Sequence, residues 1–250
     1  VLLNRFGNEP LPAANRSFIT FGFVGGIAQI AATVCLIRSF ALGNFAVGTA
    51  YSKTDTLQAA LFGIMLLGER VSVVASMGMT VSLVGVFLMS AQAKGSGIAL
   101  RNWISPGAGI GLAGGALFAL STVCYRGAAL ALPDASFVMQ AAYTQIWVTA
   151  FQALAMGVYF VIFDRAELLR VVRAWRLAWI VGASGMAASS AWFAAMAIQQ
   201  AAYVRAVGQI ELVFTFFVSL VLFRERIRPI DYAGVLLLVA GIVITVPGVA

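Results

Sequence analysis

Histidine is absent from this 250-residue sequence, cysteine occurs twice, and only 10% of the residues are charged. The two cysteines, Cys35 and Cys124, lie far apart inside apolar stretches. These scarcities argue against a Cys/His metal site or a disulfide framework, and no metal or cofactor is expected. No nucleophile lies beside a recognisable base, and the GxxxxGK[ST] phosphate-binding loop is missing. An enzyme or a directly ATP-driven protein is therefore not expected.

The low share of charge also argues against a soluble domain, in which about a quarter of the residues are charged. Hydrophobic residues make up 62% of the sequence, and the few charges cluster at the ends of long apolar runs. Lipid excludes charge from helix interiors, so this placement indicates an integral membrane protein in a lipid bilayer. The net charge of +7 does not indicate a nucleic-acid partner, because the arginines lie in short connections that suit anionic lipid. The alanine-rich composition suggests a bacterial cytoplasmic (inner) membrane.

Eight apolar stretches are long enough to cross a bilayer, which takes about 20 residues. They run over residues 18–42, 44–67, 71–91, 107–130, 135–163, 175–199, 202–223 and 230–246. The pattern predicts an all-α fold, a polytopic transmembrane helix bundle. Small residues at GxxxG spacing, Gly22 and Gly26 on one stretch and Gly107, Gly111 and Gly115 on another, predict close packing between helices.

The sequence also contains an internal repeat. The segment GERVSVVASMGMTVSLVGVFLM (68–89) aligns without a gap with RERIRPIDYAGVLLLVAGIVIT (224–245). The constant offset of 156 residues (225 minus 69) places Glu69 on Glu225, Arg70 on Arg226, Gly78 on Gly234 and Gly85 on Gly241. The same register places Asp55 on Glu211 and Lys53 on Gln209.

The offset also sets the orientation of the two copies. Five spans, an odd number, separate one copy from the next, so the second copy enters the membrane with the opposite orientation. We therefore expect inverted five-helix repeats: a first unit at residues 1–91, a connecting loop at 92–106 and a second unit at 107–250. Two spans of the first unit are not present, so we expect eight visible spans of ten and an N-terminally truncated first unit. Inverted repeats are typical of transporters that work by alternating access.

These residues give the sequence a family resemblance. The Gly68-Glu69-Arg70 and Arg224-Glu225-Arg226 signatures, each followed by the two glycines of the repeat, resemble the EamA-like family of the drug/metabolite transporter superfamily. The resemblance implies a secondary transporter or exporter of a small organic solute, such as an amino acid or related metabolite, driven by a proton gradient or by exchange. The alternative is a membrane-embedded accessory or lipid-handling protein without solute transport. Where family members often carry proline before the signature, this sequence has Asp55 and Glu211, which adds a role for intramembrane charge.

Asp55 and Glu211 are the strongest candidates for a functional site. Each lies near the middle of its span, where a charged residue costs roughly 2.5–3.5 kcal/mol on insertion scales. They are expected either to line a shared cavity as a proton-coupling or substrate-binding pair, or to be packed in interior ion pairs. Lys53 lies about 200° from Asp55 around a helix, so the two need different partners. Lys53 is expected to meet Glu211, Asp55 or a substrate carboxylate, or to be a structural counter-ion.

Helical spacing extends this candidate site to polar residues on three spans. The expected cavity walls, with simple helix packing as the alternative, consist of Tyr51, Asp55 and Gln58 on one span, Gly208, Glu211 and Thr215 on another, and Gln140, Tyr143 and Trp147 on a third. Gln209 joins the candidate binding residues as the repeat partner of Lys53. Arg38 and Arg205 lie near span ends and are expected to extend toward the interface. Glu69, Arg70, Glu225 and Arg226 are expected to cap and anchor helix ends.

Overall fold

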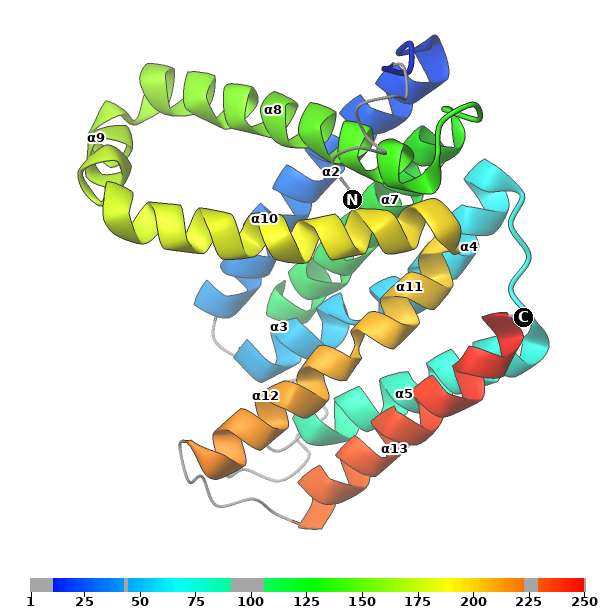
Figure 1. Cartoon of the computed structure of the whole chain (residues 1–250). Helices are drawn as coiled ribbons and strands as arrows, with labels where there is room; N and C mark the ends of the chain where they lie inside the picture. Colours follow the sequence, from blue (N-terminus) through cyan, green and yellow to red (C-terminus); the bar gives the residue numbers. More distant parts are fainter. Residues whose placement is uncertain (1–10, 43–44, 91–105, 223–228, 250) are drawn as a thin grey trace. The chain divides into compact units, whose positions relative to one another are not determined.

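A computed structural model describes residues 11–42, 45–90, 106–222 and 229–249. Its elements, drawn in Figure 1, are α2 (Arg16–Ala41), α3 (Phe45–Ser52), α4 (Asp55–Leu67), α5 (Val73–Ser90), α7 (Pro106–Leu130), α8 (Phe137–Phe163), α9 (Arg165–Arg173), α10 (Trp175–Ile198), α11 (Ala201–Gly208), α12 (Ile210–Val221), α13 (Pro229–Thr245) and the 3₁₀ turn η1 (Val246–Val249). The described part of the chain is thus helical throughout, which confirms the expected all-α class. It divides into two compact units, unit 1 with residues 1–27 and 124–198 and unit 2 with residues 28–123 and 199–250.

The predicted spans agree closely with these helices. Six segments of the described chain are long and apolar enough to cross a membrane, namely α2, α5, α7, α8, α10 and the stretch Ala201–Val218. The apolar helix α13 is shorter, with 17 residues. Two spans that the sequence predicts as continuous, 44–67 and 202–223, are each divided into two helices. The amphipathic helix α9 is not among the predicted elements.

Unit 1 contains a hairpin in which α8 and α10 are joined through α9 (Figure 1). The N-terminal half of α2 packs against α8 at the predicted GxxxG step, because a Cβ at Gly26 would lie 2.8 Å from the ring of Phe151. The start of α2 anchors a small core, in which Phe18 is buried with Ala128 and Leu132. The short side chain of Gly26 therefore allows the close helix approach that its spacing predicts.

Unit 2 is organised around the pair α5 and α13, which meet at the four glycines of the internal repeat. A Cβ at Gly78 would lie 2.7 Å from the carbonyl oxygen of Gly241, and a Cβ at Gly85 would lie 2.5 Å from that of Gly234. The earlier glycine of one helix meets the later glycine of the other, so the two helices run antiparallel. An inverted repeat requires this relative direction, while the superposition of residues 44–91 on 200–247 stays a prediction.

Also within unit 2, α7 packs closely against the end of α3. A Cβ at Gly111 would lie 2.9 Å from the carbonyl oxygen of Gly48, and a Cβ at Gly115 would lie 2.8 Å from that of Ser52. The predicted glycine ladder thus brings two backbones into contact. Its contact point is the residue at which α3 ends, so α7 supports the irregular backbone described next.

Candidate functional site

Two helices of unit 2 are interrupted at equivalent places in the internal repeat. One interruption lies between Ser52, where α3 ends, and Asp55, where α4 begins. The other lies at Gln209, between the end of α11 at Gly208 and the start of α12 at Ile210. Ser52 and Gly208 differ by the repeat offset of 156 residues. We call these two places the helix breaks (Figure 1).

Hydroxyl side chains explain the first break. The Ser52 hydroxyl donates a hydrogen bond to the Thr49 carbonyl (2.8 Å), and the Thr54 hydroxyl donates one to the Tyr51 carbonyl (2.6 Å). Such local bonds compete with the regular helical hydrogen bonds and favour an interruption. Irregular backbone at membrane depth is tolerated only where it is buried in protein or lines a polar cavity. The neighbouring residues must therefore satisfy its polar groups.

Gln209 fulfils this requirement by joining the two breaks. Its side chain is 2% exposed and donates hydrogen bonds to the Thr56 hydroxyl (2.7 Å) and to the Lys53 carbonyl (3.4 Å). Its amide oxygen accepts a hydrogen bond from the Ser82 hydroxyl on α5 (2.5 Å). Lys53 and Gln209 are repeat partners, so the two breaks touch at equivalent positions.

Two ion pairs connect the segments on either side of the breaks. Lys53 pairs with Glu211, and Arg205 pairs with Asp55. We call these four residues the charge cluster. Each acid lies in the first turn of a helix, Asp55 in α4 and Glu211 in α12, where the partial positive charge of the helix N-terminus favours a carboxylate.

The two pairs differ in their surroundings. The Asp55 side chain is 3% exposed and that of Arg205 is 18% exposed, whereas Glu211 is 53% exposed. The Arg205 guanidinium also lies 5.7 Å from the ring centroid of Phe118, within the range of a cation–π contact. The Asp55–Arg205 pair is therefore interior, and the Lys53–Glu211 pair lies at the surface of unit 2.

The predicted site residues around Asp55 have only partly the expected arrangement. Lys53 contacts Glu211, one of the partners considered from the sequence, while Asp55 contacts an arginine. The cavity shared by Asp55 and Glu211 stays a prediction. The prediction that Arg205 extends to the interface is wrong. Lys53, Asp55 and Glu211 sum to one negative charge, which was a signal that a further cation lies nearby.

The helix breaks also correct the predicted polar faces. Tyr51 lies on α3 and Asp55 on α4, so the two do not share one continuous helical face. Tyr51 instead stacks edge-on against Phe87, with ring centroids 5.4 Å apart. Gln58 follows Asp55 by one turn of α4, and its side-chain oxygen is buried without a hydrogen-bond partner in the described part of the chain.

The second break separates Gly208 from Glu211 and Thr215 in the same way. Glu211 and Thr215 remain one turn apart on α12, where the Thr215 hydroxyl donates a hydrogen bond to the Glu211 carbonyl (2.9 Å). At the end of α4, the Glu69 amide donates to the Gly63 carbonyl (3.1 Å) after Gly68 has turned into a left-handed conformation with φ of 67°. Glu225 and Arg226 lie outside the described residues.

The third predicted face belongs to unit 1. Gln140 donates hydrogen bonds to the carbonyls of Leu132 (2.9 Å) and Ala135 (3.2 Å), so it holds the turn between α7 and α8. The Tyr143 ring packs against Phe18 with a centroid distance of 5.2 Å. Both sets of contacts correspond to the packing alternative considered from the sequence.

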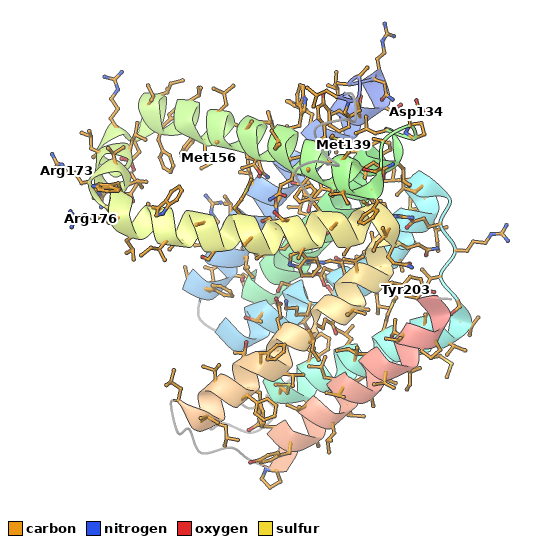
Figure 2. The ribbon with its side chains drawn as sticks, in the orientation of Figure 1. Asp134, Met139, Met156, Arg173, Arg176 and Tyr203 are labelled. Carbon is orange, nitrogen blue, oxygen red and sulfur yellow. The ribbon has the colours of Figure 1, made fainter. Side chains whose placement is uncertain are left out.

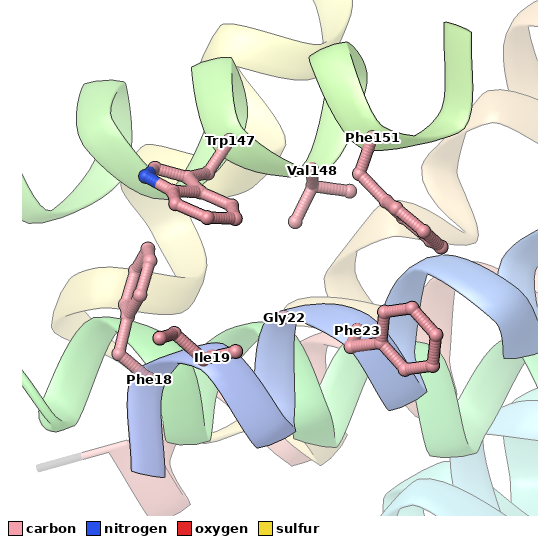
Figure 3. A pocket seen from close by; sticks show the side chains of 7 residues that line it. All are labelled: Phe18, Ile19, Gly22, Phe23, Trp147, Val148 and Phe151. Atoms are coloured by element: carbon pink, nitrogen blue, oxygen red, sulfur yellow. The ribbon is translucent and has the colours of Figure 1, made fainter. Parts of the chain in front are cut away.

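Trp147 lines an apolar groove between α2 and α8, within unit 1. The groove is shown in Figure 3, has a volume of about 40 Å³ and is lined by Phe18, Ile19, Gly22, Phe23, Trp147, Val148 and Phe151. Sites for small polar molecules combine apolar walls with a few placed polar groups. In this groove the indole nitrogen of Trp147 is the single polar side-chain atom. We therefore place the candidate site at the charge cluster and not in this groove.

Comparisons with known proteins agree with the fold. One solved crystal structure, described only as that of a protein, has a TM-score of 0.67 at 19% identity and covers 99% of this chain and 80% of its own. A search of curated proteins found no match. The sequence model of the EamA-like transporter family matches residues 105–246, more than half of the chain. This integral multi-pass membrane protein belongs to the EamA-like transporter family, whose members are membrane transporters of small solutes.

Proposed function

We propose that the protein is a secondary transporter of a small organic solute, such as an amino acid or related metabolite, that works by alternating access in a bacterial inner membrane. The observation that carries the proposal is the pair of helix breaks at repeat-related positions, joined by the charge cluster. Discontinuous membrane helices form the solute and ion sites of many transporters with inverted repeats. Unwound backbone supplies polar groups there that a continuous helix does not expose.

The charge cluster has the chemistry of a coupling element. Protonating Asp55 or Glu211 removes the negative charge that holds the paired cation, and so weakens the contact between the two breaks. A charged group of a solute acts in the same way, because it competes with one member of an ion pair for the other. Proton or solute binding is thereby linked to the opening of the contacts between α4 and α11 and between Lys53 and α12.

Flux measurements on purified protein in liposomes test this proposal. Asp55→Asn and Glu211→Gln keep the size and hydrogen-bonding capacity of the acids and remove the charge that titrates. Asp134→Asn, in the exposed turn between α7 and α8, is the matched control. We expect a pH gradient to drive solute flux in the wild type and the control, and both cluster variants to lose this response.

Two outcomes would contradict the proposal. Gradient-dependent flux that is unchanged in both cluster variants would exclude proton coupling through these acids. Lipid scrambling by the wild type in the same liposomes, without flux of any amino acid or related metabolite, would instead support the lipid-handling alternative. Thermal unfolding of each variant in detergent serves as the folding control.

A further inference from the structure

The short helix α9 differs in character from the membrane helices that it connects. It has the sequence RAELLRVVR, and none of its residues is buried. It joins α8 to α10 at the tip of the unit 1 hairpin (Figure 1). The transport proposal does not involve this helix, whose side chains require a different explanation.

The sequence of α9 is that of an amphipathic helix. Leu168, Leu169 and Val172 follow one another at spacings of one and three residues and share one face. Glu167, Arg170 and Arg173 are spaced three residues apart on the opposite side. A helix with one apolar face and one strongly basic face, attached to membrane-spanning helices, lies in the plane of the membrane interface.

The tip of the hairpin carries an excess of positive charge. Residues 164–176 contain four arginines and two acids, a net charge of +2. Both acids already have partners within α9: Glu167 forms an ion pair with Arg170 (2.6 Å), and Asp164 accepts a hydrogen bond from the Glu167 amide (3.0 Å). Arg165 caps α8 by donating a hydrogen bond to the Val161 carbonyl (2.8 Å).

Two arginines remain available to an external anion. Arg173 and Arg176 are exposed, and neither forms an ion pair with another residue in the described part of the chain. Figure 2 shows both at the turn between α9 and α10. The Arg176 guanidinium lies 5.6 Å from the ring of Trp175, which positions it without neutralising its charge.

Apolar surface continues from these arginines along the hairpin. Phe163, Trp175 and Trp179 are large, exposed side chains on the adjoining ends of α8 and α10. Tryptophan concentrates at the level of lipid headgroups, where its ring contacts both acyl chains and polar groups. The hairpin tip thus combines the basic and the aromatic groups that a phospholipid headgroup and its upper acyl chains contact.

We propose that α9 lies along the membrane interface and that Arg173 and Arg176 bind the phosphate of an anionic phospholipid. The acyl chains of this lipid lie against the aromatic flank formed by Phe163, Trp175 and Trp179. Charge complementarity selects a lipid of this class over a zwitterionic one, because the net charge of +2 favours a headgroup that keeps a net negative charge. The proposal does not depend on the transported solute.

Native mass spectrometry of the full chain, titrated in detergent with phosphatidylglycerol or phosphatidylcholine, tests this proposal. The test variant is R173Q/R176Q, and the matched control R38Q/R70Q removes two exposed arginines from other helix ends. Each basic residue near an anionic membrane surface strengthens binding roughly fivefold. We therefore expect the test variant to bind phosphatidylglycerol about 25-fold more weakly than the wild type, and the control to retain the wild-type affinity.

Brominated phosphatidylglycerol provides a second readout, since bromine quenches nearby tryptophan fluorescence. We expect strong quenching in the wild type and the control and less quenching in R173Q/R176Q. Equal affinity in both double variants, or equal binding of the two lipids by the wild type, would overturn the proposal. Displacement of the lipid by millimolar inorganic phosphate would also overturn it, since the site would then recognise a free anion. Because both arginines are exposed, unchanged thermal unfolding is expected in the test variant.

Discussion

Replacing Arg205 by methionine removes the cation that faces Asp55 and keeps a long apolar side chain. Asp55 would then remain as a carboxylate with 3% of its side chain exposed and no opposite charge in contact. Removing one partner of a buried ion pair typically costs about 3–5 kcal/mol, because the other charge stays buried and uncompensated. Loss of the contact with Phe118 adds to this cost. We therefore expect Arg205→Met to lower the free energy of unfolding by at least about 3 kcal/mol.

A double-mutant cycle separates this cost from lost packing. Unfolding of the wild type, Arg205→Met, Asp55→Asn and the double variant is measured at equilibrium in mixed micelles with increasing SDS. The double variant should be more stable than the sum of the single effects implies, because the asparagine that replaces Asp55 carries no charge that needs a partner. The same cycle with Lys53→Met and Glu211→Gln is the comparison. Since Glu211 is 53% exposed, its coupling energy should be smaller than that of Asp55 and Arg205.

Two results would refute this reasoning. A loss below about 1 kcal/mol for Arg205→Met would be typical of an exposed pair and would contradict its burial. Strictly additive effects in the Asp55–Arg205 cycle would show that the two side chains do not interact in the folded protein.

Further substitutions test the packing around the helix breaks. Gly85→Val should destabilise the protein by about 2 kcal/mol or more, because its Cβ would meet the Gly234 carbonyl oxygen at 2.5 Å; Gly182→Val, whose Cβ meets nothing within 4 Å, should be nearly neutral in the same unfolding assay. Gln209→Leu should cost about 2–3 kcal/mol, because it leaves the buried hydroxyls of Thr56 and Ser82 without their partner, and Thr215→Val, at an exposed position, should change stability by less than about 1 kcal/mol. Equal effects within either pair would contradict the described contacts.

Hydropathy and the repeat were sufficient to predict the helices and several of their contacts. Long apolar runs fix where helices form in a membrane, since lipid leaves the backbone no other way to satisfy its hydrogen bonds. The alignment of Gly78 with Gly234 and of Gly85 with Gly241 singled out the residues at which α5 and α13 meet. Side chains as small as these matter only where another backbone comes close, which is why their spacing was informative.

The helix breaks and the ion-pair partners were not predicted. A hydropathy profile does not register the hydrogen bonds by which the Ser52 and Thr54 hydroxyls interrupt a helix, because both residues are compatible with an apolar span. The predicted face through Tyr51 and Asp55 assumed one continuous helix and was wrong for this reason. The position of Arg205 near a span end suggested an interfacial arginine, and only the tertiary fold brings it to Asp55.

The most direct test of the charge cluster as the coupling element is to count the protons that accompany each solute molecule. The full chain and the Asp55→Asn/Glu211→Gln double variant are reconstituted into liposomes that contain a pH-sensitive dye, and solute and proton fluxes are recorded together. We predict that the wild type moves protons in a fixed ratio to solute, and that the double variant moves solute down its concentration gradient without protons. A double variant that keeps the wild-type proton-to-solute ratio would contradict the assignment of coupling to Asp55 and Glu211.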